Sequence, residues 1–241
     1  MIRLLLICFG TVCAAFAHYT WIAPVALWEV GKPAALQIGH GHRFPLSEEA
    51  INARQVDLFV VSPSGARTKL TAAPAGPAVT STFTPKEQGP HRIAFVQDRG
   101  VTSRTPRGVK PGGRDQNPDA KSASRTLRTA VSYVGTNGAA PVAGKPLGLE
   151  IELCAELVNG AWNLLALKQG KPMSGVGIEV FLAGAEKALD AGKTDGNGKL
   201  RYQPPAGAKG PAVFTLELKE PAPAGSNYDT ANYETSLYVN W

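Results

Sequence analysis

Thr194-Asp195-Gly196-Asn197-Gly198-Lys199-Leu200 is the stretch that says most about the fold of this 241-residue chain. Its Asp-Gly and Asn-Gly pairs supply the positive-φ positions that a tight turn between two strands requires. Apolar runs lie on both sides of it, at residues 176–182 and 212–218. We therefore predict a β-hairpin here, with further strands around it.

The same pattern extends along almost the whole chain. Short apolar runs alternate with clusters of Gly, Pro, Ser and Asn, which is typical of β-sandwiches, and only residues 48–54 suggest a short helical turn. We predict an all-β protein with two immunoglobulin-like or transthyretin-like sandwich domains, residues 18–135 and 145–241, joined by a linker at 135–144. Strands are expected at residues 34–40, 56–61, 69–72, 79–83, 91–96 and 129–134, and then at 147–153, 162–167, 176–182, 212–218 and 235–239.

Residues 100–124 interrupt this pattern. They are rich in Pro, Gly and charge, and so long a stretch without strand signals usually marks a functional or disordered loop. We expect a long basic loop that is disordered in the free protein.

The N-terminus has the three parts of a secretory signal. Met1-Ile2-Arg3 is basic, residues 4–14 are apolar, and Ala15-Phe16-Ala17 offers small residues for cleavage. The apolar run is shorter than the ~20 residues that a membrane helix needs. We predict a signal peptide at residues 1–17 and a soluble, exported, periplasmic product that begins with His18.

Charge and cysteine content exclude some functions. The net charge is +6, and much of the excess lies between Arg99 and Arg128, where no aromatic side chains alternate with the basic ones. Nucleic acid is therefore not the expected partner.

Cys8 and Cys13 leave with the signal peptide, so Cys154 has no partner for a disulfide. Its apolar surroundings favour a buried, inert thiol.

The predicted cleavage turns His18 into a two-donor metal ligand, because it frees an α-amine beside the ring Nδ1. That amine has a pKa of about 7.7–8.0, so a divalent metal displaces its proton near neutral pH. His40 and His42 lie two residues apart in Gly39-His40-Gly41-His42, a spacing that places both rings on one face of a strand. Imidazole suits nickel, copper, zinc and iron.

Two carboxylates and a fourth histidine are further candidates for this metal site, and the His40–His42 pair also has an alternative interpretation. Glu48 and Glu49 follow closely and would add an oxygen ligand or orient a ring. His91 is the fourth histidine and a fourth candidate ligand, although its place after Gly89-Pro90 also fits a surface or loop residue. For His40 and His42 the alternative is a polar, glycine-rich turn.

Several motifs together resemble a known family. Gly170-Lys171-Pro172 followed by the residue 194–198 turn looks like a transthyretin-like or collagen-adhesin-B-like sandwich repeat. With His18-Tyr19-Thr20-Trp21-Ile22, residues 39–45 and residues 146–151, the chain resembles an uncharacterised periplasmic family associated with cobalt and nickel uptake. The resemblance implies nickel or cobalt binding in support of a membrane metal-transporter component.

Three functions therefore remain open. The first is a periplasmic nickel- or cobalt-binding protein that is not itself an enzyme. The second is a copper carrier or oxidative copper enzyme, since an N-terminal histidine with an internal histidine on a sandwich resembles a histidine brace. The third is a metal-free interaction module, because fold alone does not fix function.

Overall fold

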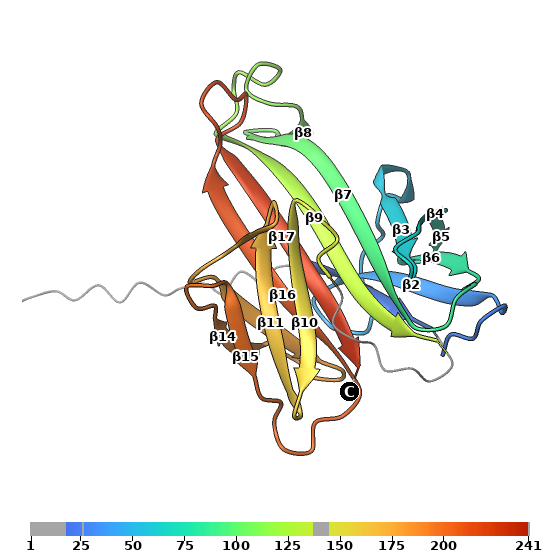
Figure 1. The fold of residues 1–241 in the computed structure, drawn as a ribbon. Helices are drawn as coiled ribbons and strands as arrows, with labels where there is room; N and C mark the ends of the chain where they lie inside the picture. The colour runs from blue at the N-terminus through green and yellow to red at the C-terminus, as the bar shows by residue number, and fades with distance from the viewer. Residues whose placement is uncertain (1–17, 26, 137–144, 241) are drawn as a thin grey trace, which may run out of the picture.

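The computed structural model describes residues 18–25, 27–136 and 145–240 (Figure 1). The predicted signal peptide, 1–17, and residues 137–144 of the predicted linker lie outside these ranges. Within them the chain forms strands and one 3-10 turn, η1 (Ala53–Gln55), but no α-helix, so the all-β prediction is confirmed. No helix in the described part of the chain has the length and apolarity to cross a membrane.

Most strands follow the predicted positions, with additional short strands between them, but the strand predicted at 147–153 begins at Ile151 and runs to Val158. They are β1 (Tyr19–Pro24), β2 (Ala34–Gly41), β3 (Asp57–Val61), β4 (Arg67–Leu70), β5 (Ala73–Ala75), β6 (Ala78–Phe83), β7 (Pro90–Thr105), β8 (Gly108–Pro111), β9 (Ser122–Gly135), β10 (Ile151–Val158), β11 (Ala161–Lys168), β12 (Lys171–Pro172), β13 (Gly177–Leu182), β14 (Leu189–Lys193), β15 (Lys199–Tyr202), β16 (Pro211–Pro221) and β17 (Thr230–Asn240).

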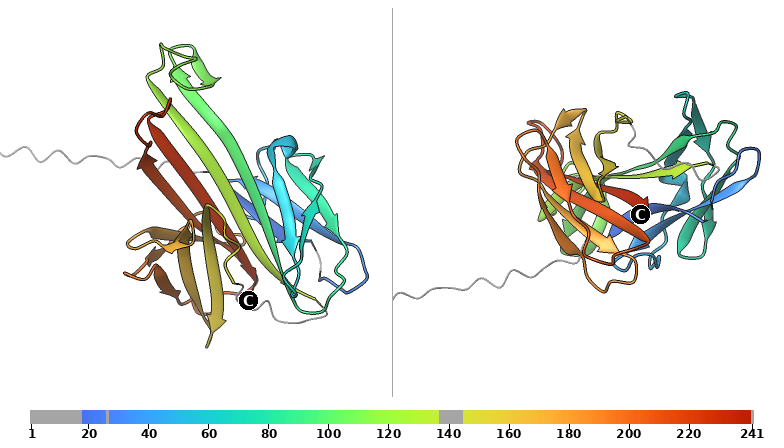
Figure 2. Two further views of the ribbon diagram at one scale, coloured as in Figure 1. Left: turned by 45° about the horizontal axis from the view of Figure 1, so that its top comes forward. Right: turned by 60° about the horizontal axis from the view of Figure 1, so that its bottom comes forward.

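A nine-stranded sheet forms the centre of the molecule. Its order is β14-β13-β16-β17-β9-β7-β3-β4, with β8 paired to β7. A four-stranded sheet, β1-β2-β6-β5, lies on one side, and a second, β10-β11-β12 with β15 on β11, lies on the other. Figure 2 shows the long central strands between the two smaller sheets.

Both faces of the central sheet are buried, and strand alternation explains how. On β3, Phe59 contributes to the core shared with β10 and β11, whereas Leu58 contributes to the core shared with β2 and β6. Successive side chains of a strand point to opposite faces, so β3 reads as a continuous apolar run. A third cluster, which includes Tyr19 and Trp21, joins β1 to Val213 of β16 and Tyr238 of β17.

The predicted domain boundary does not interrupt the central sheet. β9, from the predicted first domain, pairs in parallel with β17, from the predicted second domain, between Ser124↔Thr230 and Ser132↔Tyr238. One core likewise contains residues from both segments. The two sandwiches therefore have the central sheet in common and do not pack as separate units.

The turn expected within residues 194–200 forms, but the predicted hairpin is wrong. Gly198 has a φ of +72°, and the Asp195 carboxylate accepts hydrogen bonds from the backbone N–H groups of Asn197 and Lys199. The turn joins β14 to β15, yet β14 pairs with β13 and β15 pairs with β11. The chain therefore crosses from one sheet to another here.

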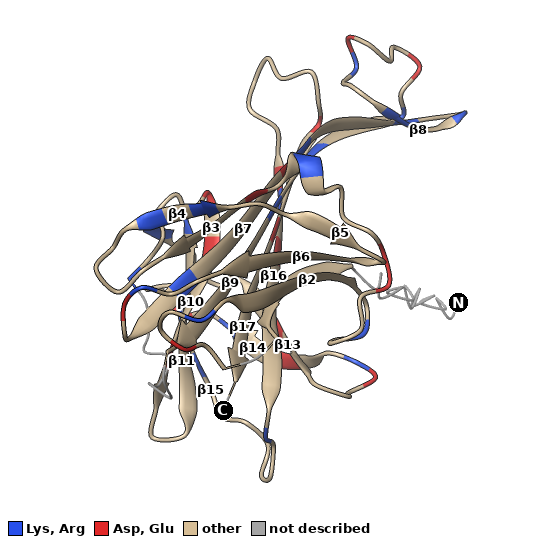
Figure 3. Cartoon of the chain, turned by 90° about the vertical axis from the view of Figure 1, so that its right-hand side faces the viewer, with Lys and Arg blue, Asp and Glu red and all other residues tan. Residues whose placement is uncertain are grey.

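The predicted disorder of residues 100–124 is also wrong. β7 extends to Thr105 and β9 begins at Ser122; the two strands pair from Val101↔Arg125 to Arg104↔Ser122, and β8 pairs with the end of β7. The Arg114 guanidinium holds Asp229 of the β16–β17 connection at 2.7 Å and also donates to the carbonyl of Ala120. Figure 3 shows basic residues at this β8 end of the molecule. The basic residues of this stretch therefore lie on or next to an ordered extension of β7 and β9 and not on a disordered loop.

Candidate metal-binding site

The pairing of β1 with β2 brings three of the four histidines together. Thr20 lies opposite His40 and Tyr19 lies opposite Gly41, so His18 adjoins the end of β2. The His18 ring centroid is 3.7 Å from that of His42 and 5.4 Å from that of His40. The expected proximity of position 18 to the Gly-His-Gly-His segment is therefore present.

His40 is fixed in one tautomer by the backbone. Its Nδ1 lies 3.1 Å from the Tyr19 carbonyl oxygen and 3.0 Å from the Thr20 hydroxyl. A carbonyl only accepts hydrogen bonds, so Nδ1 carries the proton and Nε2 presents its lone pair. Burial of the side chain, helped by the nearby Arg128 and His18, lowers the pKa of His40 to about 3. The ring is neutral, as a metal ligand must be.

The loop after β2 folds back over these rings. The N–H groups of Glu48 and Glu49 both donate to the His40 carbonyl, at 2.8 and 3.1 Å. Glu49 Oε1 is 2.8 Å from His18 Nε2, and its other oxygen is 3.9 Å from His40 Nε2. The predicted contact of these carboxylates with the histidines therefore forms.

Glu48 is held in place by its own hydrogen bonds. It accepts from the His42 backbone N–H at 2.7 Å and from Arg43 Nε at 3.0 Å, and it lies 3.4 Å from His42 Nδ1. The His42 N–H, followed by Arg43, lowers the pKa of the Glu48 carboxyl to about 2. Glu48 thus orients His42 from outside the ring cluster, whereas Glu49 faces the rings themselves.

Arg128 on β9 completes the surroundings of His40. Its Nη1 is 3.2 Å from His40 Nε2, and its Nε donates to Glu234 of β17 at 2.5 Å. Arg128 is 9% exposed, which is unusual for an arginine unless it is paired. The sequence analysis missed Arg128 and Glu234, because nothing local links residues so far from His40 along the chain.

The small residues beside His40 also have a structural reason. Gly39 lies opposite Trp21, and a Cβ added to Gly39 would be 2.3 Å from Trp21 Cζ2. The absence of a side chain at Gly39 therefore leaves room for the Trp21 ring, and this contact positions the strand that carries His40.

His91 lies elsewhere, and its predicted surface position is wrong. It is fully buried in β7, with ring centroids of Trp28 and Phe83 at 5.7 and 5.8 Å. It pairs with Val134, whereas Arg128, which contacts His40, lies six residues earlier on β9. At ~3.3 Å per residue, that separation is ~20 Å. The structure does not bring His91 to the other three histidines.

The expected state of Cys154 is confirmed. Its thiol is buried, and it is the free cysteine of the described chain. Burial raises the pKa of Cys154 to about 12. A thiol so far from ionisation is a poor nucleophile and a poor metal ligand.

As the side chains stand, no three His, Cys, Asp or Glu groups among the described residues are arranged to hold a metal ion. Two features account for this. Glu49 and Arg128 already contact His18 Nε2 and His40 Nε2. In the full-length chain the His18 nitrogen is also bonded to Ala17, so it is no donor. The donor types fit a divalent transition metal, but the arrangement needs these partners to move.

Comparison with known proteins places the chain in a family without an assigned function. Residues 15–210 match the family described as a domain of unknown function, DUF4198. The chain belongs to this family. No curated protein matches the sequence. Among solved structures, it is similar to the D0-D1 domain of intimin, at 12% identity and a TM-score of 0.24, with 92% of this chain and 97% of that chain covered.

Proposed function

We propose that this is an exported, periplasmic protein that binds nickel or cobalt as cargo and supports its uptake, after cleavage between Ala17 and His18. The observation that carries the proposal is the state of His40. Its Nδ1 is held by a backbone carbonyl, so the neutral ring directs the lone pair of Nε2 toward Arg128 Nη1 at 3.2 Å, with a Glu49 oxygen 3.9 Å away. A hydrogen bond on one ring nitrogen that fixes the other for a metal is the usual outer-shell arrangement of metal-ligating histidines.

Cleavage would supply the donors that the uncut chain lacks. The freed amine and ring of His18 would join His40 Nε2 and the His42 ring, which already lie around the His18 side chain. Glu49 is 54% exposed, so its carboxylate is able to turn toward solvent or to remain as an oxygen donor. Arg128 has Glu234 as a second partner, which would hold its charge if it left His40.

The link to nickel and cobalt uptake rests on the motif resemblance. The family description assigns no activity, so the metal's identity and the membrane transporter component that would receive it come from that resemblance. Convergence of three histidines distinguishes this proposal from a metal-free interaction module, for which their positions would have no reason to coincide.

Copper is the second candidate, favoured by the donor types. An amine and two or three imidazoles form a nitrogen-rich set, and tetragonal nitrogen coordination favours Cu(II) or Ni(II). A copper carrier and an oxidative copper enzyme would share this set. Peroxide production or polysaccharide cleavage by the copper-loaded protein would identify the enzyme.

Equilibrium dialysis of the mature protein against nickel, cobalt and copper tests the proposal. The matched control carries one additional residue before His18, which blocks the amine and leaves every side chain unchanged. We expect the extended form and the His40→Ala variant to bind the preferred ion at least ~10-fold more weakly. His91→Gln, at the distant histidine, should bind as the unmodified protein does.

Equal affinity of the mature and extended forms would refute the amine's role. Equal affinity of the mature protein and His40→Ala would remove the site altogether. The ion with the highest affinity decides between nickel or cobalt on the one hand and copper on the other.

A further inference from the structure

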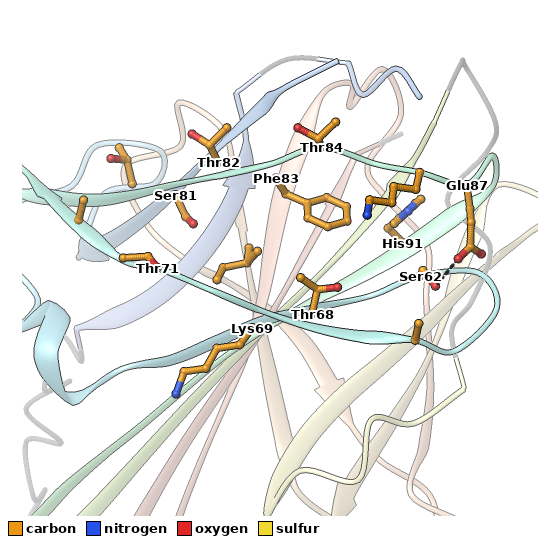
Figure 4. Close-up of a pocket in the computed structure, with 15 residues that line it drawn as sticks. Ser62, Thr68, Lys69, Thr71, Ser81, Thr82, Phe83, Thr84, Glu87 and His91 are labelled. Carbon is orange, nitrogen blue, oxygen red and sulfur yellow. Dashed lines mark hydrogen bonds between the residues drawn. The ribbon is translucent and has the colours of Figure 1, made fainter. Parts of the chain in front are cut away.

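A cavity of about 830 Å³ opens between β4 and β6 at the edge of the sandwich that contains β2 and β3 (Figure 4). Its size falls within the range of small-molecule sites. It lies at His91, ~20 Å along the central sheet from the level of Arg128. Seven of its fifteen lining residues carry a hydroxyl group: Ser62, Thr68, Thr71, Thr80, Ser81, Thr82 and Thr84. Ser81 and Phe83 lie on one face of β6, whereas Thr82 and, just beyond the strand, Thr84 lie on the other (Figure 4).

Two buried polar groups in this cavity have no hydrogen-bond partner in the described chain. One is His91 Nε2, on a fully buried side chain, and the other is Ser81 Oγ, on a residue that is 6% exposed. A buried polar group without a partner costs about 1–3 kcal/mol. Trp28 Nε1 is also unpartnered within the described residues, but Trp28 does not line the cavity. Figure 4 shows the His91 and Ser81 side chains together with Phe83 in the cavity.

The tautomer of His91 says what a ligand must offer. Its Nδ1 lies 3.1 Å from the Gly89 carbonyl oxygen, which only accepts, so Nδ1 carries the proton. Nε2 is therefore an acceptor, and it needs an O–H or N–H donor. Burial keeps the ring neutral by lowering its pKa. A lone pair at the base of the cavity disfavours an anion.

The Glu87 carboxylate in the lining does not favour a cation either. It already accepts from the hydroxyls of Ser62 and Ser64, at 3.0 and 2.8 Å, and from the Ser64 N–H at 3.0 Å. Lys69 is 79% exposed and lies near Asp57. Lys86, which also lines the cavity, is exposed. The Glu87 carboxylate is thus already hydrogen-bonded, and the lysines extend toward solvent. The side chains deeper in the cavity carry no charge.

Phe83 supplies the remaining feature. Its ring is half-buried and is held by Trp28, at 5.4 Å between centroids, and by His91. A rigid aromatic ring beside hydroxyls suits a ligand with an apolar face and polar edges. A sugar ring has both, since its C–H groups and its hydroxyls point in different directions.

We propose that this cavity binds a neutral carbohydrate, whose hydroxyl donates to His91 Nε2, whose other hydroxyls bond Ser81 and Thr68, and whose apolar face packs on Phe83. The site is separate from the proposed metal site and does not depend on it.

Titration of the full mature chain, with ¹⁵N-labelled histidine, by maltose, cellobiose and diacetylchitobiose tests this. At least one sugar should shift the His91 Nε2 resonance saturably, because that nitrogen gains a donor, and should leave the His40 resonances unchanged. Thr68→Val removes a hydroxyl that lies between β4 and β6 on the side of Phe83 (Figure 4) and should weaken binding at least 3-fold. Thr230→Val, on β17, is the matched control and should have no effect.

Two results would overturn the proposal. One is that none of the three sugars moves the His91 resonance at any soluble concentration. The other is that the shift is the same in Thr68→Val as in the control. A His91 shift caused by a charged peptide, and not by the sugars, would assign the cavity to a different ligand and reject the carbohydrate.

Discussion

Replacing Gly39 by alanine tests the packing that positions His40. An ideal Cβ on Gly39 lies 2.3 Å from Trp21 Cζ2 and 2.4 Å from Trp21 Cε2. Carbon atoms pack at ~3.5–4.0 Å, so the ring or the strand must move by ~1 Å or more. Trp21 is 1% exposed, in a cluster with Phe44 and Tyr238, and has little room to yield.

The expected loss of stability follows from two opposing terms. Overpacking a core costs about 1–3 kcal/mol or more, whereas Gly→Ala gains ~0.4–1 kcal/mol by restricting the unfolded chain. We expect a net destabilisation of ~1–2 kcal/mol, measured by urea denaturation. Gly177→Ala is the matched control, since Gly177 also lies in a strand but nothing comes within 4 Å of a Cβ added there and its φ is not positive. That variant should be neutral or slightly stabilised.

The same variant reports on the candidate site. A shift of Trp21 or β2 would displace His40 from the Tyr19 carbonyl, so the His40 ring resonances should change in Gly39→Ala and stay unchanged in Gly177→Ala. If Gly39→Ala were as stable as Gly177→Ala, the close contact between Gly39 and Trp21 would be refuted, along with the reasoning built on it.

Three further predictions concern other parts of the molecule. Arg128→Met should destabilise the fold by about 2 kcal/mol, because it leaves the partly buried Glu234 carboxylate without its ion-pair partner. Adding Glu234→Gln should recover part of this loss in urea denaturation. If the losses of the two single variants simply summed in the double variant, the pairing would be contradicted. The Cys154 thiol, with its pKa raised from about 9 to about 12, should react with iodoacetamide ~1000-fold more slowly in the native than in the unfolded protein near pH 8. Its contribution to stability should be complete below pH 9 and disappear between pH 9 and 12, and fast native labelling would contradict the burial. Trypsin should cleave slowly at Arg114 in the native protein, because the β7–β9 ribbon is ordered and Arg114 is tied to Asp229; cleavage there before any other site would favour the disordered loop.

The sequence determined the local features of this fold. Alternating apolar residues and turn-forming dipeptides located the strands around Ile38, Val60, Leu164 and Val180, because a strand half-buried in a sandwich needs a two-residue period. The apolar run around Cys154 likewise located that residue in a core. Each of these depends on residues that are near one another in the chain.

Only the tertiary structure decided how distant strands combine. No local signal shows that β9 pairs with β17 or that the Asp195–Gly198 turn crosses between sheets. Nor does any local signal show that residues 100–124 extend a ribbon, because backbone pairing stabilises Pro- and Gly-rich segments that composition alone marks as loops. For the same reason the sequence grouped four histidines as candidate ligands. The β1–β2 register brings together His18, His40 and His42, and Arg128 contacts His40. His91 lies instead at the cavity between β4 and β6. Residue type determined which groups were able to bind a metal, and strand register determined which of them meet.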